Sequence, residues 1–154
     1  MRTLDELIVQ SPVFEGLDQE ELELIAGCGK NIAVDAGERL FREGDDANTF
    51  FLVREGLVAL DAYVPNRGQV TVVTCGPGEI VGWSWLVPPY KWRLTARVVE
   101  SARVVEFDGA CLRRKCDEIP ALGYDLLSRI AGDLADHLQS AYLQVIDVYG
   151  DGSS

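Results

Sequence analysis

The spacing of hydrophobic and polar positions divides this sequence into a helical start, a strand-rich middle and a helical end. Over residues 3–29 the apolar positions recur at helical spacing and predict two short helices, which Ser11-Pro12 separates. Asp18 stands directly before the second helical stretch, where its carboxylate can accept hydrogen bonds from free backbone amides. We therefore expect Asp18 to begin the second helix.

Residues 31–107 show a different pattern, in which glycine turns separate short runs of β-branched and aromatic residues. Such runs are typical of an antiparallel barrel or roll, because glycine accepts the positive φ that tight corners need. The predicted strands are Ile32–Val34, Arg39–Phe41, Thr49–Val53, Leu57–Ala62, Val70–Thr74, Glu79–Val81, Thr95–Val99 and Ala102–Phe107.

Residues 108–149 return to helical spacing. Asp108 can cap a short helix that reaches about Cys116, and Pro120 lies in the first turn of a long helix, where its missing N–H costs nothing. The long helix is predicted to run to about Val148. The expected fold class is α+β: an antiparallel β-roll (double-stranded β-helix, jelly-roll-like) flanked by N-terminal helices and a long C-terminal helix. We expect a single domain over residues 1–154.

The long helix also carries a heptad pattern. Its apolar residues are spaced alternately four and three positions apart: Leu127, Ala131, Leu134, Leu138, Ala141, Val145 and Val148. Two helices wind around each other with this spacing, which predicts a homodimer through the 120–148 helix. A second stripe beside its start, formed by Leu122, Leu126 and Ile130, is expected to pack back on the roll. The alternative is a single helix lying on its own domain, which also needs an apolar stripe.

Charge narrows the classes of partner. The chain has 14 basic and 25 acidic residues, a net charge of −11. This balance argues against non-specific binding to nucleic acids and to anionic membranes, because both need a basic face. The sequence contains no apolar run of the roughly 20 residues that a membrane-spanning helix requires. The acidic start of the chain differs from a signal peptide, so we expect a cytoplasmic protein.

The four cysteines and the single histidine do not form the motif of a metal site or of a His-dependent catalytic site. Cys28, Cys75, Cys111 and Cys116 show no metal-knuckle or redox-motif spacing. In a cytoplasmic protein we expect them to be reduced and mostly buried. No catalytic residues and no metal ligands are predicted.

Several segments follow one another in the order and spacing of a known family. They are Pro12–Leu17, Ala36–Asp45, Thr49–Val53, Glu55-Gly56 and Gly76–Gly82. Together they resemble the cyclic nucleotide-binding domain of catabolite-activator-type (Crp/Fnr-like) bacterial regulators, over nearly the whole chain. Transcription factors of that family continue from the long helix into a helix-turn-helix. Because this sequence stops at Ser154, we expect no direct binding to DNA.

The resemblance implies that a phosphate-binding cassette follows Gly82, with a short helix whose N-terminal amides meet a cyclic phosphate. The family pattern is Gly-Glu-x-x-Leu and, later, an Arg. The Glu accepts a hydrogen bond from the ribose 2′-hydroxyl, and the Arg pairs with the phosphate. In this chain Trp83 stands at the Glu position, and Trp92 stands at the Arg position when no gap is allowed. Arg93 comes one residue late, and strand alternation turns it to the opposite face unless a bulge at Pro88-Pro89 restores it.

All three tryptophans of the chain lie in this cassette, and three interpretations remain. The tryptophans fill the pocket that a nucleotide would use. Alternatively, the pocket still binds a nucleotide or a related anion, through backbone amides, Ser84 and either Arg93 or Lys91, with a tryptophan stacked on the base. In the third interpretation the aromatic residues are exposed and dock a protein partner. The candidate ligand-binding residues are Gly82, Trp83, Ser84, Trp85, Trp92, Arg93 and Tyr142.

Other candidates carry less information. In relatives a residue of the long helix lies over the base, and His137 or Tyr142 matches that place, although both can equally be half-exposed helix residues. The basic triplet Arg113-Arg114-Lys115 is expected to be a solvated helix end. No cofactor is predicted, apart from a cyclic nucleotide as the open candidate.

The resulting hypothesis is a regulatory or sensor module and not an enzyme, because no nucleophile–base pair or pair of catalytic acids is recognisable. The module would bind a small ligand, such as a nucleotide or another anion, or would have lost that ligand. The alternative is a ligand-free dimeric adaptor that contacts a protein partner through the cassette.

Overall fold

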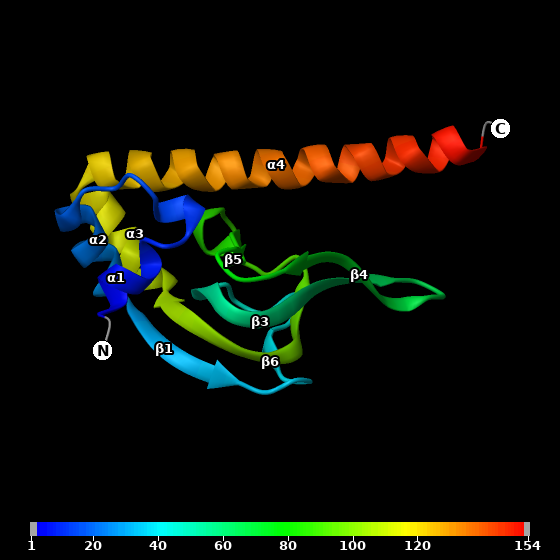
Figure 1. Cartoon of the computed structure of the whole chain (residues 1–154), viewed down its shortest axis with the longest axis horizontal. Coiled ribbons are helices and arrows are strands. Elements are labelled where there is room, and N and C mark those ends of the chain that lie inside the picture. Colours follow the sequence, from blue (N-terminus) through cyan, green and yellow to red (C-terminus); the bar gives the residue numbers. More distant parts are fainter. Residues whose placement is uncertain (1–2, 153–154) are drawn as a thin grey trace.

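A computed structural model describes residues 3–152, and the ends of the expected domain lie outside the described residues. Helices and strands follow the predicted order (Figure 1). The N-terminal elements are α1 (Leu4–Ile8), the 3-10 turn η1 (Pro12–Phe14) and α2 (Gln19–Ala26). The strands are β1 (Gly29–Val34), β2 (Arg39–Phe41), β3 (Thr49–Val64), β4 (Gly68–Cys75), β5 (Ile80–Val81) and β6 (Thr95–Asp108). A second 3-10 turn, η2 (Ser84–Leu86), precedes β6, and α3 (Gly109–Glu118) and α4 (Pro120–Gly152) complete the chain.

The predicted helix starts are confirmed. Oδ1 of Asp18 accepts a hydrogen bond of 2.8 Å from the backbone N–H of Glu21, and Oδ1 of Asp108 accepts one of 3.0 Å from that of Cys111. Each carboxylate therefore satisfies an amide that the helix leaves free in its first turn. Pro120 is the first residue of α4, which continues to Gly152 and so extends beyond the predicted end near Val148.

The strands form one six-stranded sheet with antiparallel pairing, in the order β1-β6-β3-β4, with β2 on β6 and β5 on β3. The long strands β3 and β6 pair from Thr49↔Asp108 to Asp61↔Thr95 and form the spine of the sheet. Strand curvature gives an open, jelly-roll-like roll with helices at one end (Figure 1), which confirms the predicted fold class.

Two boundaries predicted within the roll were wrong. Thr49–Val53 and Leu57–Ala62 belong to the single strand β3, and Thr95–Val99 and Ala102–Phe107 belong to β6. Gly56 suggests a turn, but it lies in an irregular region of the β3–β6 ladder with φ of 90°. A Cβ at this position would lie 2.5 Å from the carbonyl oxygen of Ser101, so glycine allows the two strands to approach.

The cysteine prediction also needs correction. Cys28, directly after α2, and Cys111, in the first turn of α3, form a disulfide with a Cα–Cα distance of 5.9 Å. These residues are 83 positions apart, and the pairing of Gly29 with Phe107, together with the hydrogen bond from the backbone N–H of Asp108 to the carbonyl oxygen of Cys28, brings them together. Cys75 and Cys116 are free thiols, and Cys75 is buried.

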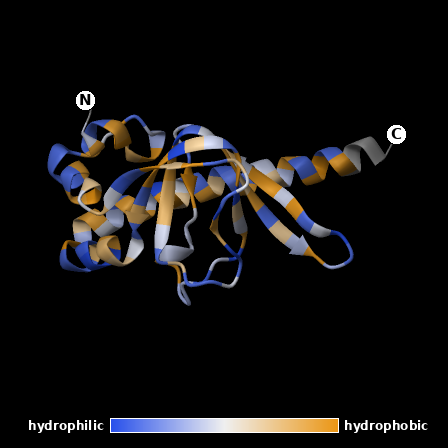
Figure 2. Cartoon of the chain, turned by 90° about the horizontal axis from the view of Figure 1, so that it is seen from below, coloured by the Kyte–Doolittle hydropathy of each residue, from blue (hydrophilic) through white to orange (hydrophobic). Residues whose placement is uncertain are grey.

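The long helix α4 has two different environments. Leu122, Leu126 and Ile130 are buried in the same core cluster as the sheet residues, as predicted for the second stripe. From Leu138 to Val148 every residue is exposed, and the apolar side chains there have nothing of their own chain over them. Figure 2 shows hydrophobic residues along the part of α4 that runs toward the C-terminus.

Candidate functional site: the tryptophan cassette

Residues 82–93, here called the cassette, connect β5 to β6. Strand β5 pairs with β3 through Phe51↔Val81 and Leu52↔Ile80, which fixes where the cassette begins. At Gly82 the chain turns with φ of 93°, a conformation that glycine adopts without penalty. The helix expected after it is only the three-residue turn η2. Because the turn is so short, it lacks the summed dipole that a longer helix directs at an anion.

Trp92 occupies the interior of the roll. Its side chain is 4% exposed and stacks on Phe41, with ring centroids 3.6 Å apart and an interplanar angle of 11°. A Cβ at Gly82 would lie 2.7 Å from two ring carbons of Trp92, so only glycine fits beneath the indole. Phe41, Gly82 and Trp92 thus form one packed unit, in which the backbone at Gly82 lies close to both aromatic rings.

Trp85 points to the other side of the cassette, into the core near the helices. It is fully buried, and its ring stacks on Phe50, which stacks in turn on Phe107, with centroid distances of 4.4 and 4.6 Å. Its Nε1 is buried and has no hydrogen-bond partner among the described residues. Leaving such a donor unpaired costs about 1–3 kcal/mol, which the burial of the large ring offsets.

Trp83 and Arg93 lie at the mouth of the site. Trp83 is half-buried, and the guanidinium of exposed Arg93 lies 5.6 Å from the centroid of its ring. Between the cassette and the roll there remains a cavity of about 20 Å³, lined by Phe41, Leu60, Gly82, Trp83, Ser84, Trp92, Arg93 and Leu94. This space is comparable to that of a single water molecule.

Comparison with known proteins identifies the family to which this fold belongs. The family model described as "Cyclic nucleotide-binding domain" matches residues 32–118, more than half of the chain. The chain belongs to the cyclic nucleotide-binding domain family. A crystal structure of a Geobacter metallireducens GS-15 protein assigned to the cyclic nucleotide-binding proteins is similar, with 31% identity and a TM-score of 0.80. The match covers 90% of this chain and 99% of that one.

Two curated relatives of this domain family are similar over most of the chain. The cAMP-dependent protein kinase regulatory subunit of Schizosaccharomyces pombe is 26% identical over 71% of this chain and 26% of its own length. The cyclic AMP receptor protein of Thermus thermophilus is 26% identical over 82% of this chain and 58% of its own. The chain thus spans between about a quarter and three fifths of these two relatives. Among residues 3–152, no helix is both long enough and apolar enough to cross a membrane.

In this cyclic nucleotide-binding domain, five of the seven candidate binding residues lie around one cavity. These are Gly82, Trp83, Ser84, Trp92 and Arg93. Trp85 faces the helical end of the core instead, and Tyr142 is 60% exposed on α4 and is absent from the cavity wall. Strand alternation does not apply to Trp92 and Arg93, because both precede β6; Trp92 is buried and Arg93 is exposed, yet both line this cavity.

The basic triplet is more than a solvated helix end, which corrects that expectation. Arg113 on α3 donates a hydrogen bond from Nη1 to the carbonyl oxygen of Trp85, and its guanidinium lies 4.5 Å from the Tyr90 ring centroid. Lys115 donates from Nζ to the carbonyl oxygen of Leu24, at 2.7 Å. Only Arg114 of the triplet is exposed. Arg113 thus connects the cassette to the helix that precedes α4, a link that the sequence pattern did not indicate.

A second, more polar cavity lies between β4 and α4. Its volume is about 450 Å³, and its wall includes Thr71, Thr74, Glu79, His137, Ser140 and Gln144. Nε2 of His137 is 3.9 Å from a carboxylate oxygen of Glu79. On the same turn of α4, burial raises the pKa of Asp133, and His137 opposes that shift. His137, the other long-helix candidate, thus faces the sheet and not the tryptophans.

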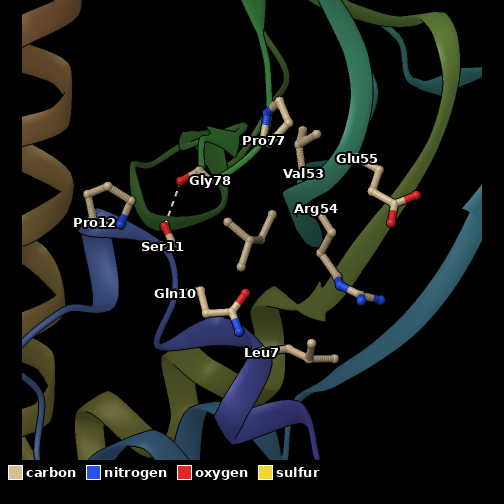
Figure 3. A pocket seen from close by; sticks show the side chains of 10 residues that line it. Leu7, Gln10, Ser11, Pro12, Val53, Arg54, Glu55, Pro77 and Gly78 are labelled. Carbon is tan, nitrogen blue, oxygen red and sulfur yellow. Dashed lines mark hydrogen bonds between the residues drawn. The ribbon is translucent and has the colours of Figure 1, made fainter. Parts of the chain in front are cut away.

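A third cavity lies on the side of α1 and η1 (Figure 3). It measures about 390 Å³ and is lined by Gln10, Arg54 and Glu55 together with apolar residues of α1, β3 and the Pro77-Gly78 turn. The hydroxyl of Ser11 donates to the carbonyl oxygen of Gly78 at 2.6 Å and ties η1 to this turn. None of the predicted binding residues lies in this cavity.

Proposed function

We propose that this chain is a dimeric regulatory module in which the cassette tryptophans keep the roll closed and cyclic nucleotides bind weakly or not at all. The observation that carries the proposal is the position of Trp92 against Phe41, which leaves about 20 Å³ in the roll. A nucleotide needs many times that space, since pockets for small molecules measure about 300–1,000 Å³. Binding there would require Trp92 to leave the interior.

The side chains available for recognition support the same conclusion. Trp83 stands where the family has the carboxylate for the ribose hydroxyl, and an indole offers no acceptor there. Losing a hydrogen bond to a charged acceptor of this kind costs about 1–3 kcal/mol. Arg93 contacts Trp83 from outside, and Trp92 occupies the position counted for the phosphate-binding arginine.

Intrinsic fluorescence tests the proposal, because all three tryptophans of the chain report on the cassette. Titration with cAMP and cGMP should leave the emission unchanged up to millimolar nucleotide, and calorimetry should detect no saturable heat. The variant Trp83→Glu plus Trp92→Arg restores the family pattern and should bind more tightly than the wild type, provided that circular dichroism shows it folded. Sub-micromolar affinity of the wild type for either nucleotide would contradict the proposal.

The second candidate function is a sensor whose cassette still takes an anionic ligand. It is favoured by the outward position of Arg93 over the half-buried ring of Trp83. In that case nucleotide should quench Trp83, and Arg93→Gln should abolish the quenching. Arg67→Gln, in the exposed turn between β3 and β4, should leave the quenching intact.

The proposed output is a protein–protein contact and not catalysis or direct DNA binding. The names of the similar proteins support a regulatory role, since they describe a kinase regulatory subunit and a receptor protein. The net charge of −11 opposes attraction to phosphate backbones, so we expect no gel shift with this chain at physiological salt. A salt-sensitive shift would contradict that part of the proposal.

A further inference from the structure

A cationic cavity of about 340 Å³ lies apart from the cassette. Its wall consists of Arg39, Arg42, Asp61, Gln69, Thr95 and Arg97, which come from β2, the residues after it, β3, β4 and β6. Side chains alternate between the faces of a strand, and Leu60 lines the cassette cavity. Asp61, the next residue of β3, therefore points to the opposite face, and this cavity does not overlap the cassette.

The floor of the cavity is a fixed ion pair. Asp61 is 4% exposed, and its carboxylate accepts hydrogen bonds from Nε of Arg97 at 3.0 Å and from the hydroxyl of Thr71 at 2.7 Å. Burial alone would raise the pKa of Asp61, but the hydrogen bonds from Arg97 and Thr71, together with the positive charges of Arg97 and Arg39, outweigh burial and lower it. Asp61 therefore stays ionised and fixes the orientation of the Arg97 guanidinium, whose Nη1 takes no part in these contacts.

Arg39 and Arg42 also line the cavity but take no part in this ion pair. Both are exposed, Arg39 is paired with Arg97 across β2 and β6, and neither forms an ion pair with another described residue. The lining thus carries three guanidiniums and one carboxylate, 3 − 1 = +2, in a chain whose net charge is −11. One carboxylate does not neutralise three guanidinium groups, so the cluster is suited to an anion with at least two charges.

We propose that this cavity binds the phosphoryl groups of a small phosphorylated anion. Guanidinium groups match phosphate oxygens in paired, charge-assisted hydrogen bonds, and Arg97 is already oriented by its neighbours. Arg39 and Arg42 approach from β2 and from the residue after it, and Thr95 and Gln69 add neutral polar groups to the wall. This proposal is independent of the closed cassette, because the two sites lie on opposite faces of β3.

The probe is sodium pyrophosphate, titrated calorimetrically into the whole chain at an ionic strength held constant with sodium chloride. We expect saturable binding at one site per chain. The double variant Arg39→Gln plus Arg42→Gln should weaken it at least about tenfold, because two of the three charge-assisted contacts are lost. It keeps Arg97, so Asp61 retains its partner and the fold should persist by circular dichroism.

The matched control is Arg67→Gln plus Arg114→Gln, which removes the same charge from two exposed positions outside the cavity. It should keep the wild-type affinity. Equal weakening by both double variants would show a general charge effect and overturn the proposal, as would the absence of saturable heat with the wild type. Unchanged affinity in Arg39→Gln plus Arg42→Gln would also overturn it.

Discussion

The indole of Trp92 and the phenyl ring of Phe41 lie face to face inside the roll, 3.6 Å apart between centroids. Phe41 ends β2, and its ring also stacks on that of Phe51 at 6.3 Å, so Trp92 extends an aromatic layer of the sheet. The cassette is therefore held by the same kind of apolar packing as the core. Its closure depends on how closely the backbone at Gly82 approaches the indole.

Gly82→Ala should destabilise the protein more than Gly37→Ala. Both glycines have positive φ, 93° and 95°, so an added Cβ costs about 1–2 kcal/mol of backbone strain at each. At Gly37 the new methyl group meets nothing within 4 Å, whereas at Gly82 it meets Trp92 at 2.7 Å. We expect an additional loss of about 1–3 kcal/mol for Gly82→Ala from overpacking, measured by urea unfolding. Equal losses in the two variants would show that the Trp92 ring is not held in place.

The sequence predicted much of the fold because the relevant signals are local. Asp18 and Asp108 each precede a helical stretch, and their caps depend only on residues three positions away. Gly56 misled the strand prediction for a local reason as well. Glycine permits a turn and a bulge equally, and only the neighbouring strand at Ser101 decides between them.

The state of the cassette was not predictable in the same way. Trp83, Trp85 and Trp92 have the same side chain within ten residues, yet one is half-buried and two are buried in different parts of the core. Their partners Phe50 and Phe41 come from β3 and β2, and no periodicity in the cassette indicates these contacts. The contacts of Arg113 and the disulfide likewise join segments that only tertiary packing brings together.

Removing the disulfide should lower stability without abolishing the fold. The double variant Cys28→Ser plus Cys111→Ser frees a loop of 83 residues in the unfolded chain, at a cost of about 2–4 kcal/mol. Urea unfolding without reductant measures the difference. Dithiothreitol should lower the free energy of unfolding of the wild type by a similar amount and leave that of the double variant unchanged. A reductant effect of the same size in both proteins would mean that the bond contributes nothing.

Cys75 should make the protein sensitive to alkaline pH. Burial, with smaller contributions from Glu79 and Asp133, raises the pKa of its thiol from 9.0 to about 12. Because the folded pKa lies above the unfolded one, the stabilising contribution is complete below pH 9 and is lost as pH rises from 9 toward 12. At pH 10 the loss is about 1.4 kcal/mol.

The measurement compares urea unfolding at pH 8 and pH 10 for the protein and for Cys75→Ala. Both carry Cys116→Ser, which removes the other free thiol. The fall in stability between the two pH values should be smaller in Cys75→Ala by that amount. An equal fall in the free energy of unfolding in the two proteins would show that the Cys75 thiol ionises equally in the folded and unfolded chains.

Leu138→Asp should convert the proposed dimer into a folded monomer. Leu138 is 52% exposed in the single chain and lies in the middle of the heptad seam, so in a dimer an aspartate there would bury an unpaired charge. Ile146→Asp is the matched control, because Ile146 is 61% exposed on the same part of α4 but lies outside the seam. Light scattering at tens of micromolar should give a dimer for the wild type and for Ile146→Asp, and a monomer for Leu138→Asp. Both variants should retain the stability of the core, since neither residue belongs to the buried cluster. A monomeric wild type would mean that α4 packs only on its own domain, through Leu122, Leu126 and Ile130, and that the exposed seam does not pair with a second copy.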